Sequence, residues 1–394
     1  MLQALLSTAT LLGSVPLAPG DPYDPAAGEA AGPRDAPVGA LPPLQDPAAE
    51  DIWSRLSLYA DGRVRFEGTL DQLNGEDRYR GRLRFRVGGE YKIHSQVRAG
   101  ARFTTLSDGR DANNPHWDFG DGEDGFSAAE VGLDRLYLGW RPKESLDLVG
   151  GKFGHTFTRP PVTREFAWDD DVQPAGAALT WAPELKDSSV RYDVRLLTVV
   201  ATEINADSGS GSDPAMHGLQ ANLMMGSKES LDFHFASSVS KWTNLEHFTE
   251  FPSAGNTAAA GGFLIWDTYA AATWHHDVAP TTAFAEYLNN IDDDSGEDTG
   301  YVAGLQVGPT SGKGNGNFFA AFYMLDANSI FAPVAQDDTP IQGSGIGEGM
   351  DGYVLGYQHF ITDNLSVRLW GLTSDVDADD DPYRVRLDFD FRVR

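Results

Sequence analysis

Arginine recurs at every second position in several segments of the sequence, and this spacing gives the side chains a shared chemistry. In residues 80–93 the arginines have one parity and the large apolar residues have the other, and residues 383–393 repeat the pattern. A β-strand points alternate side chains to opposite faces, so each segment would present a row of guanidinium groups on one face. Such a row along a narrow aqueous passage would attract and bind anions.

Basic residues of the same parity occur in other alternating segments, so the row would continue around a closed sheet. The alternative interpretation is that these arginines only contact one another and water. The predicted pore-lining residues are Arg63, Arg65, Arg82, Arg84, Arg86, Arg98, Arg102, Arg135, Lys152, Arg191, Arg195, Arg368, Arg384 and Arg386.

An acidic loop that folds toward this basic row would create a transverse field, and such a field would orient dipolar solutes. The longest connection between the alternating segments, residues 105–130, is the candidate for this constriction loop. The predicted constriction residues are Asp108, Asp111, Asp118, Asp121, Glu123 and Asp124.

Period-two alternation continues from about residue 53 onward, where no segment of comparable quality has a helical period. The sequence therefore predicts an all-β fold of about sixteen strands. Most of them reach the length of about 9–11 residues that a tilted strand needs to cross a bilayer. The predicted strands are 56–70, 80–93, 96–104, 131–141, 146–156, 175–182, 189–202, 216–225, 230–242, 264–276, 281–290, 300–308, 317–328, 351–361, 365–373 and 383–393.

The connections between these strands alternate between short and long. Outer-membrane barrels have short periplasmic turns and long extracellular loops, whereas a soluble sandwich has no reason to keep such an order. The apolar parity would face lipid and the polar parity would face water, because a dry interior could not accept the charged face of residues 383–393. The prediction is a transmembrane, antiparallel, up-and-down β-barrel with long acidic extracellular loops.

The composition excludes several functions. The 394 residues include 58 acidic and 30 basic side chains, and the net charge of −28 argues against a nucleic-acid partner. The eight long connections hold 32 acidic and four basic residues, so the excess acid belongs to the loops rather than to the wall. The absence of cysteine excludes disulfides, cysteine zinc sites and thiol nucleophiles.

Three regions are expected along the chain. Residues 1–20 have the apolar character of a signal peptide and are too short to span a bilayer as a helix. Residues 21–52 are rich in proline and alanine, and this composition predicts a linker. Residues 53–394 form the predicted barrel.

Specific segments resemble a known family. They are RGRLRFRVGGEYKIHSQVRAGARFTT (80–105), VGLDRLYLGWRP (131–142), GGKFGHTFTRP (150–160) and AWDDDVQPAGAAL (167–179). Over roughly residues 53–180 the chain is similar to the putative porin family of Gram-negative outer membranes. The resemblance implies a barrel in the bacterial outer membrane that passes small solutes by diffusion. It also implies contact with outer-membrane lipid and lipopolysaccharide, and assembly as a homotrimer.

The expected function is a water-filled channel for small hydrophilic solutes and ions, with anion preference from the basic row. The alternatives are a substrate-specific channel for phosphate or an acidic sugar, or a closed structural barrel. No cofactor is expected, and no metal site, because acidic clusters such as residues 169–171 lack the spacing of a calcium loop. No enzyme is expected either: His234 with Ser238 or Ser240 is the nearest catalytic candidate, and no oxyanion motif accompanies it.

Overall fold

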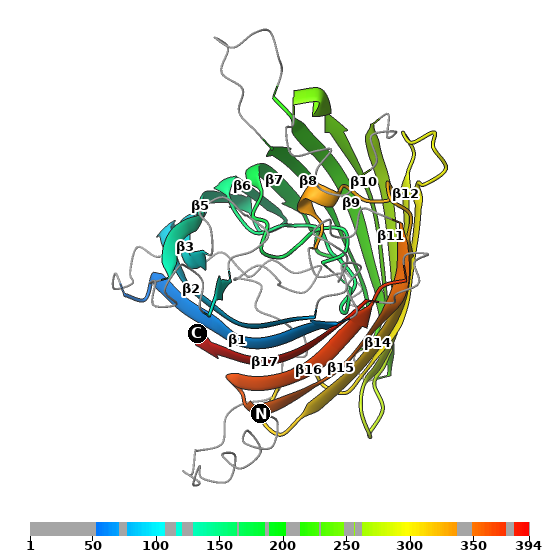
Figure 1. Ribbon diagram of the computed structural model, residues 1–394. Coiled ribbons are helices and arrows are strands. Elements are labelled where there is room, and N and C mark those ends of the chain that lie inside the picture. The colour runs from blue at the N-terminus through cyan, green and yellow to red at the C-terminus, as the bar shows by residue number, and fades with distance from the viewer. Residues whose placement is uncertain are drawn as a thin grey trace.

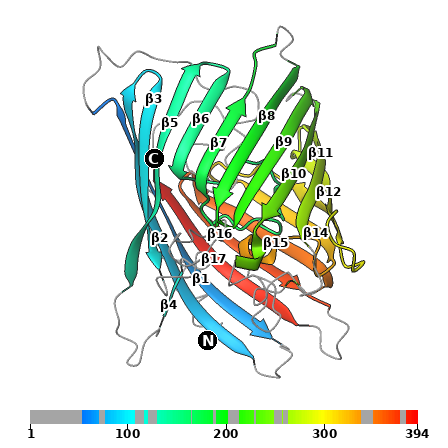
Figure 2. The same cartoon turned by 90° about the horizontal axis from the view of Figure 1, so that it is seen from above.

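The computed structural model of the chain is a closed antiparallel β-barrel (Figure 1). The residues that it describes are 53–70, 77–106, 116–119, 129–163, 165–185, 189–201, 213–227, 230–247, 256, 262–336, 349–375 and 382–393. Within them every wall strand pairs with its two neighbours, and the first strand pairs with the last, which closes the ring. Figure 2 shows this closure, where β17 lies beside β1, and the tilt of the strands that closure requires.

Sixteen strands of the described chain form the wall. Their bounds are β1 (Leu56–Leu70), β2 (Arg78–His94), β3 (Val97–Leu106), β5 (Glu130–Lys143), β6 (Leu146–Lys152), β7 (Ala175–Trp181), β8 (Val190–Val200), β9 (Ala215–Gly226), β10 (Leu231–Thr243), β11 (Phe263–Trp274), β12 (Thr281–Asn290), β13 (Thr299–Val307), β14 (Gly316–Leu325), β15 (Met350–Thr362), β16 (Leu365–Thr373) and β17 (Tyr383–Val393).

Three short elements lie in the connections. The two-residue strand β4 (Trp117–Asp118) pairs with β2 beyond the point where β3 ends. The 3-10 helices η3 (Leu245–His247) and η5 (Ala332–Val334) lie in two of the long connections. No helix of the described chain has both the length and the apolar character needed to cross a membrane.

The prediction of an all-β barrel with about sixteen strands is confirmed, and most strand bounds agree within a few residues. The largest difference is at β6, which ends at Lys152 rather than at residue 156. Phe153 continues the pairing by one residue, since it is completely buried and donates its backbone N–H to the carbonyl of Pro174 at 3.0 Å, and the chain beyond it is not part of a strand. The expected segments 1–20 and 21–52 lie outside the described residues.

The outward face of the wall is apolar, as the alternation predicts. On β1, Phe66 is 43% exposed, while Arg65 and Glu67 on either side of it are buried against the lumen. The same alternation occurs on β2, where Phe85 is exposed between two buried arginines. The face assigned to lipid therefore carries the large apolar side chains, and the charged parity of these strands points inward.

The inward face is not polar everywhere, which differs from the simple alternation. On β14 both parities are apolar, and inward-facing Phe319, Tyr323 and Leu325 are buried. They belong to an apolar cluster with β11, β12, β13 and β15, and this cluster is covered from inside by Phe166 and Ile330. Two connections, residues 153–174 and 326–336, fold into the barrel and keep this part of the wall dry. Figure 1 shows both inside the ring of strands.

The outward position of Leu196 provides a test of the two faces. Leu196 is 45% exposed near the middle of β8, between Leu179 and Leu219 in the register. We predict that Leu196→Arg lowers the free energy of unfolding by about 2–4 kcal/mol in lipid vesicles, the cost of a charge on the lipid face near the midplane. Urea titration measures it. The Leu196→Ala variant is the control, and an equal loss in both variants would contradict the assignment.

Candidate functional site

The inner wall around β1 is a ladder of arginines and carboxylates. The register places Arg65 opposite Asp388, and Arg63 opposite Asp390, on β17. In both pairs the arginine Nε donates to a carboxylate oxygen at 2.7 Å. Arg386 on β17 donates in turn to Glu67 on β1 at 2.5 Å. Cross-strand pairing on one face therefore builds the ladder.

The ladder continues around the wall through β2, β3 and β5. Arg86 donates to Asp61 at 2.8 Å, and Arg98 donates to both oxygens of Asp147 at 2.7 Å. Arg102 lies almost completely buried. Inward-facing arginines of the predicted pore-lining set are Arg63, Arg65, Arg82, Arg84, Arg86, Arg98, Arg102, Arg135, Arg191, Arg195, Arg368, Arg384 and Arg386.

Lys152 is the exception in the predicted pore-lining set. It pairs in the register with Leu136, which is 58% exposed on the outward face, and Lys152 itself is exposed. Paired residues of neighbouring strands share a face, so Lys152 lies outside the lumen. The prediction is wrong here because Lys152 shares the apolar parity of Leu146 and Leu148 on β6, and that parity faces outward.

Carboxylates that accompany the arginines were missed by the sequence analysis. Asp61, Glu67, Asp134 and Asp147 were not among the predicted site residues, yet each contacts an arginine of the ladder. A signal was present on β1, where Asp61 and Glu67 have the same parity as the two arginines between them. The inner wall is therefore a network of shared ion pairs rather than a bare row of positive charges.

The segment that crosses the lumen is residues 153–174, between β6 and β7. One side of it carries the aromatic rings of Phe157 and Trp168, which pack into an apolar cluster with Met216 on β9 and Trp242 on β10. Phe157 lies directly over Gly218, where a β-carbon would approach its ring to 2.8 Å. The absence of a side chain at Gly218 thus allows the ring to seat against the wall.

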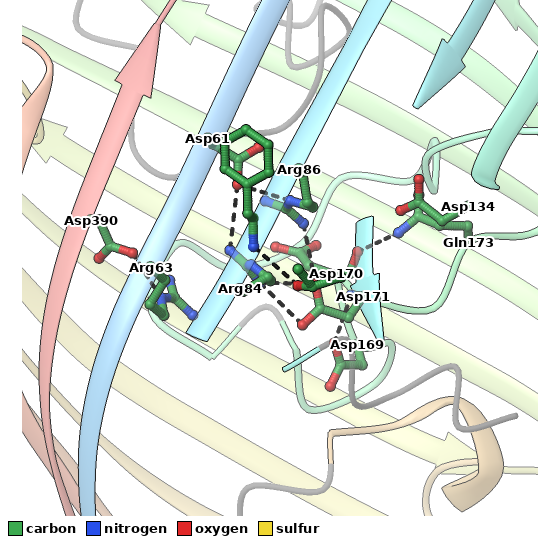
Figure 3. Close-up of polar contacts among 12 residues, drawn as sticks. Asp61, Arg63, Arg84, Arg86, Asp134, Asp169, Asp170, Asp171, Gln173 and Asp390 are labelled. Atoms are coloured by element: carbon green, nitrogen blue, oxygen red, sulfur yellow. Dashed lines mark hydrogen bonds and ion pairs between the residues drawn. The ribbon is translucent and has the colours of Figure 1, made fainter. Parts of the chain in front are cut away.

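The other side of the same segment meets the arginine ladder (Figure 3). Asp171 accepts from Arg84 Nη1 at 2.9 and 3.1 Å and from Arg86 Nη1 at 3.2 Å. Gln173 accepts from Arg135 Nε at 2.6 Å. The segment joins an apolar half of the wall to a charged half, and it narrows the lumen between them.

A different loop from the expected one therefore supplies the carboxylate opposite Arg84 and Arg86. Of the predicted constriction residues, only Asp118 is described; it lies on β4 at the edge of the wall and accepts from Arg82 Nε at 2.8 Å. The predicted residues Asp108, Asp111, Asp121, Glu123 and Asp124 lie outside the described residues. The choice of residues 105–130 used length and acidity, whereas the aromatic residues of the shorter segment fix its inward path.

A small cavity of about 50 Å³ lies behind the crossing segment. Its lining includes Asp267 on β11, His155 and Arg159. Glu286 on the neighbouring strand β12 is buried, while Arg159 is paired with Asp170.

The second infolded segment completes the apolar packing inside the barrel. Phe331 lies between Trp242 and Phe263, with ring centroids at 4.0 and 5.2 Å. The amide of Asn256 donates to the carbonyls of Ala327 and Ile330 at 2.9 and 2.8 Å, and thereby fixes the path of this segment.

The residues considered for catalysis face the lumen. Ser238 is buried on the inward parity of β10, and Ser240 shares that parity. The ring of His234 packs edge-on against Tyr269, with centroids 5.3 Å apart. The acidic residues of the 169–171 cluster contact arginines, through Asp171 to Arg84 and Asp170 to Arg159.

Gly218 gives a test of how the crossing segment is anchored. We predict that Gly218→Val displaces Phe157, widens the lumen and raises the single-channel conductance. A cost in folding stability of about 1–3 kcal/mol should accompany it, as for other overpacked sites. Planar-bilayer recording measures the conductance. Ala221→Val, on the outward face of the same strand, should leave the conductance unchanged. Unchanged conductance in both variants would contradict the anchoring role.

His116 gives a test of the charge near the ladder. Burial, and then the charges of Arg65 and Arg82, hold the pKa of His116 well below its usual value. The unfolded chain binds a proton below about pH 6.5 that the folded barrel does not bind. The free energy of unfolding should therefore fall as the pH drops below about 6.5, and it should fall less in His116→Gln. Urea titration at pH 7.5 and 5 measures the difference; parallel loss in both proteins would contradict the burial of His116.

Comparison with solved structures shows that the fold occurs in other proteins. The closed barrel is similar to OprB of Pseudomonas putida, with a TM-score of 0.57, 14% identity, and coverage of 86% of this chain and 94% of that chain. OmpF of Salmonella typhi, solved in complex with daunomycin, has a TM-score of 0.49 and 14% identity over 85% of this chain and 97% of that chain. A search of curated protein sequences found no match.

The sequence comparison with protein families gives the identification. The family model for putative porins matches residues 57–263, which is more than half of the chain. The match includes β1, β2, β3 and the crossing segment, and so contains most of the charged half of the lumen. The chain belongs to the putative porin family, and it is a channel-type β-barrel of the bacterial outer membrane.

Proposed function

We propose that the barrel is a channel for passive diffusion of small hydrophilic solutes and that it prefers anions. The observation that supports the preference is how the carboxylates of the inner wall are shared. Glu67 contacts Arg80, Arg386 at 2.5 Å and Arg384 at 4.0 Å. Asp118 also contacts Arg80 and Arg82, so the group holds two carboxylates among at least four arginines. Each guanidinium carries a full charge, and the group therefore stays positive.

Other groups of the ladder are close to charge balance. Asp388 lies 2.7 Å from Arg65 and 3.9 Å from Arg63, and Arg63 also pairs with Asp390. Two carboxylates, Asp61 and Asp171, face the two arginines of β2. Other arginines interact with neutral groups: Arg135 donates to the amide of Gln173, and the guanidinium of Arg368 lies over an aromatic ring. In a narrow lumen with low-dielectric walls, this positive excess would favour anions.

A closed structural barrel is the second candidate. Its support is the packing of residues 153–174 and 326–336 against the inner wall, which fills part of the lumen with apolar side chains. Bilayer recording separates the candidates, since a closed barrel gives no conductance. Conductance that saturates with one anion would indicate a substrate-specific channel for phosphate or an acidic sugar.

The surroundings of the barrel are also part of the proposal. The apolar outer face suits outer-membrane lipid, and the acidic connections would meet lipopolysaccharide through bridging divalent ions. We also propose that the barrel assembles as a homotrimer, because the resemblance to porins implies it. Analytical ultracentrifugation in density-matched detergent tests it, and a monomer at all concentrations would contradict it.

Neutralisation of the ladder tests the anion preference. We predict that replacing Arg82, Arg84 and Arg86 with Gln shifts the reversal potential in a KCl gradient toward cation preference. The substitutions leave Asp61, Asp118 and Asp171 without those positive partners. The control is Lys152→Gln, which removes a positive charge from the outward face and should not shift the reversal potential. Cation preference in the unmodified barrel, unchanged by the triple substitution, would contradict the proposal.

A further inference from the structure

The carboxylate of Asp171 occupies a position that would accept a free carboxylate. Its Oδ1 lies 2.9 Å from Arg84 Nη1 and 3.2 Å from Arg86 Nη1, and its Oδ2 lies 3.1 Å from Arg84 Nη1. One carboxylate therefore bridges two guanidinium groups on the inner face of β2. Charge-assisted hydrogen bonds of this kind are the usual way in which proteins recognise small carboxylate ligands.

Arg84 and Arg86 form a buried anion-binding position, and the strands of the wall provide only one carboxylate for the two guanidinium groups. Arg84 is 7% exposed and Arg86 is 4% exposed. The carboxylate of the wall, Asp61, accepts from Arg86 Nε at 2.8 Å and lies 3.8 Å from Arg84 Nη2. Arg84 Nε is buried and has no hydrogen-bond acceptor in the described part of the chain. Asp61 alone would leave one carboxylate for two buried guanidinium groups, and a buried charge without an opposite charge is costly, so the position calls for a second anion.

Asp171 belongs to the crossing segment, and the turn that presents it is held by its own residues. The backbone N–H of Asp171 donates to Asp169 Oδ1 at 2.7 Å, and that of Val172 donates to the Asp169 carbonyl at 3.1 Å. Trp168 Nε1 donates to the Val172 carbonyl at 2.9 Å. In the described structure, the side-chain hydrogen bonds of Asp171 go to Arg84 and Arg86. Rotation of this one side chain would vacate the site while the turn stays in place.

We propose that Arg84 and Arg86 form a binding subsite for small carboxylate solutes, and that Asp171 is a tethered internal ligand that such solutes displace. The proposal deepens the anion channel proposed above and rests on it for the passage of the solute. Beyond its α-carbon the aspartate side chain is chemically an acetate group. The solute class that best matches the site is therefore a short-chain carboxylate, with acetate as the simplest probe.

Competition with an internal ligand suits a channel. A tethered group has an effective concentration of millimolar or more, so a free carboxylate binds weakly to the occupied site and leaves readily. A conducting site has to bind strongly enough to admit the solute and weakly enough to release it. Return of Asp171 to the arginines would assist release, because it restores the bridge between the two guanidinium groups.

Chemical rescue tests the proposal on the folded barrel. The Asp171→Ala variant removes the internal ligand, and its thermal midpoint is measured in detergent with sodium acetate, sodium chloride or sodium phosphate at equal ionic strength. We expect acetate to raise the thermal midpoint of the Asp171→Ala variant. In the unmodified protein Asp171 competes with acetate, so the same rise should require an acetate concentration at least about tenfold higher. Asp170→Ala is the matched control, since Asp170 contacts Arg159 instead.

The outcomes separate a displaceable internal ligand from a purely structural contact. If acetate stabilises Asp171→Ala no better than chloride does, or stabilises Asp170→Ala equally, the contact of Asp171 is only structural and the proposal is wrong. Phosphate rescue without acetate rescue would also overturn the carboxylate assignment. If Asp171→Ala does not fold, the Asp171→Asn variant keeps the size of the side chain, and its acetate conductance should saturate at a concentration at least about tenfold lower than in the unmodified channel. Failure of anion preference would show in the reversal potential, separately from this binding measurement.

Discussion

The contact of Asp171 with Arg84 and Arg86 joins the two halves of the lumen, and the rest of the interior is arranged around it. One half of the wall is lined by arginines and carboxylates, and the other half by aromatic and aliphatic side chains. Residues 153–174 meet both halves: the Phe157 ring lies against Gly218, while Asp171 bridges the arginines. A segment that carries both kinds of group can stay inside a barrel because neither is left unsatisfied.

The charged half follows from the cost of burying ions. A guanidinium without a partner in a narrow lumen is strongly unfavourable, and most arginines of the ladder lie beside a carboxylate, an amide or an aromatic ring. Cross-strand register provides most of these partners, as in the pairing of Arg65 with Asp388. Some carboxylates, such as Glu67, contact several arginines, and some arginines, such as Arg98, contact two carboxylates, so the ladder is a connected network of ion pairs. The same network therefore holds the wall together and sets the charges that face the lumen.

The sequence predicted the wall well because period-two alternation is a local property. The strands, their number and the inward parity of the arginines all followed from it, and only Lys152, next to two glycines, was placed on the wrong face. The interior could not be predicted in the same way. Which connection folds inward depends on contacts between residues distant in the chain, such as Trp168 with Trp242. Length and acidity pointed to residues 105–130, most of which lie outside the described residues. The contact of Phe157 with Gly218 and an apolar patch on β9–β11 hold residues 153–174 inside the barrel.

The most direct test of this account is a double-mutant cycle between Asp171 and Arg84. The free energy of unfolding in lipid vesicles would be measured for the unmodified barrel, for Asp171→Asn, for Arg84→Gln and for the double variant. If the crossing segment is held against the ladder by this bridge, the two losses are not additive, and the coupling energy is at least about 1 kcal/mol. Additive losses, with a coupling energy near zero, would show that Asp171 does not reach the arginines and would contradict the account.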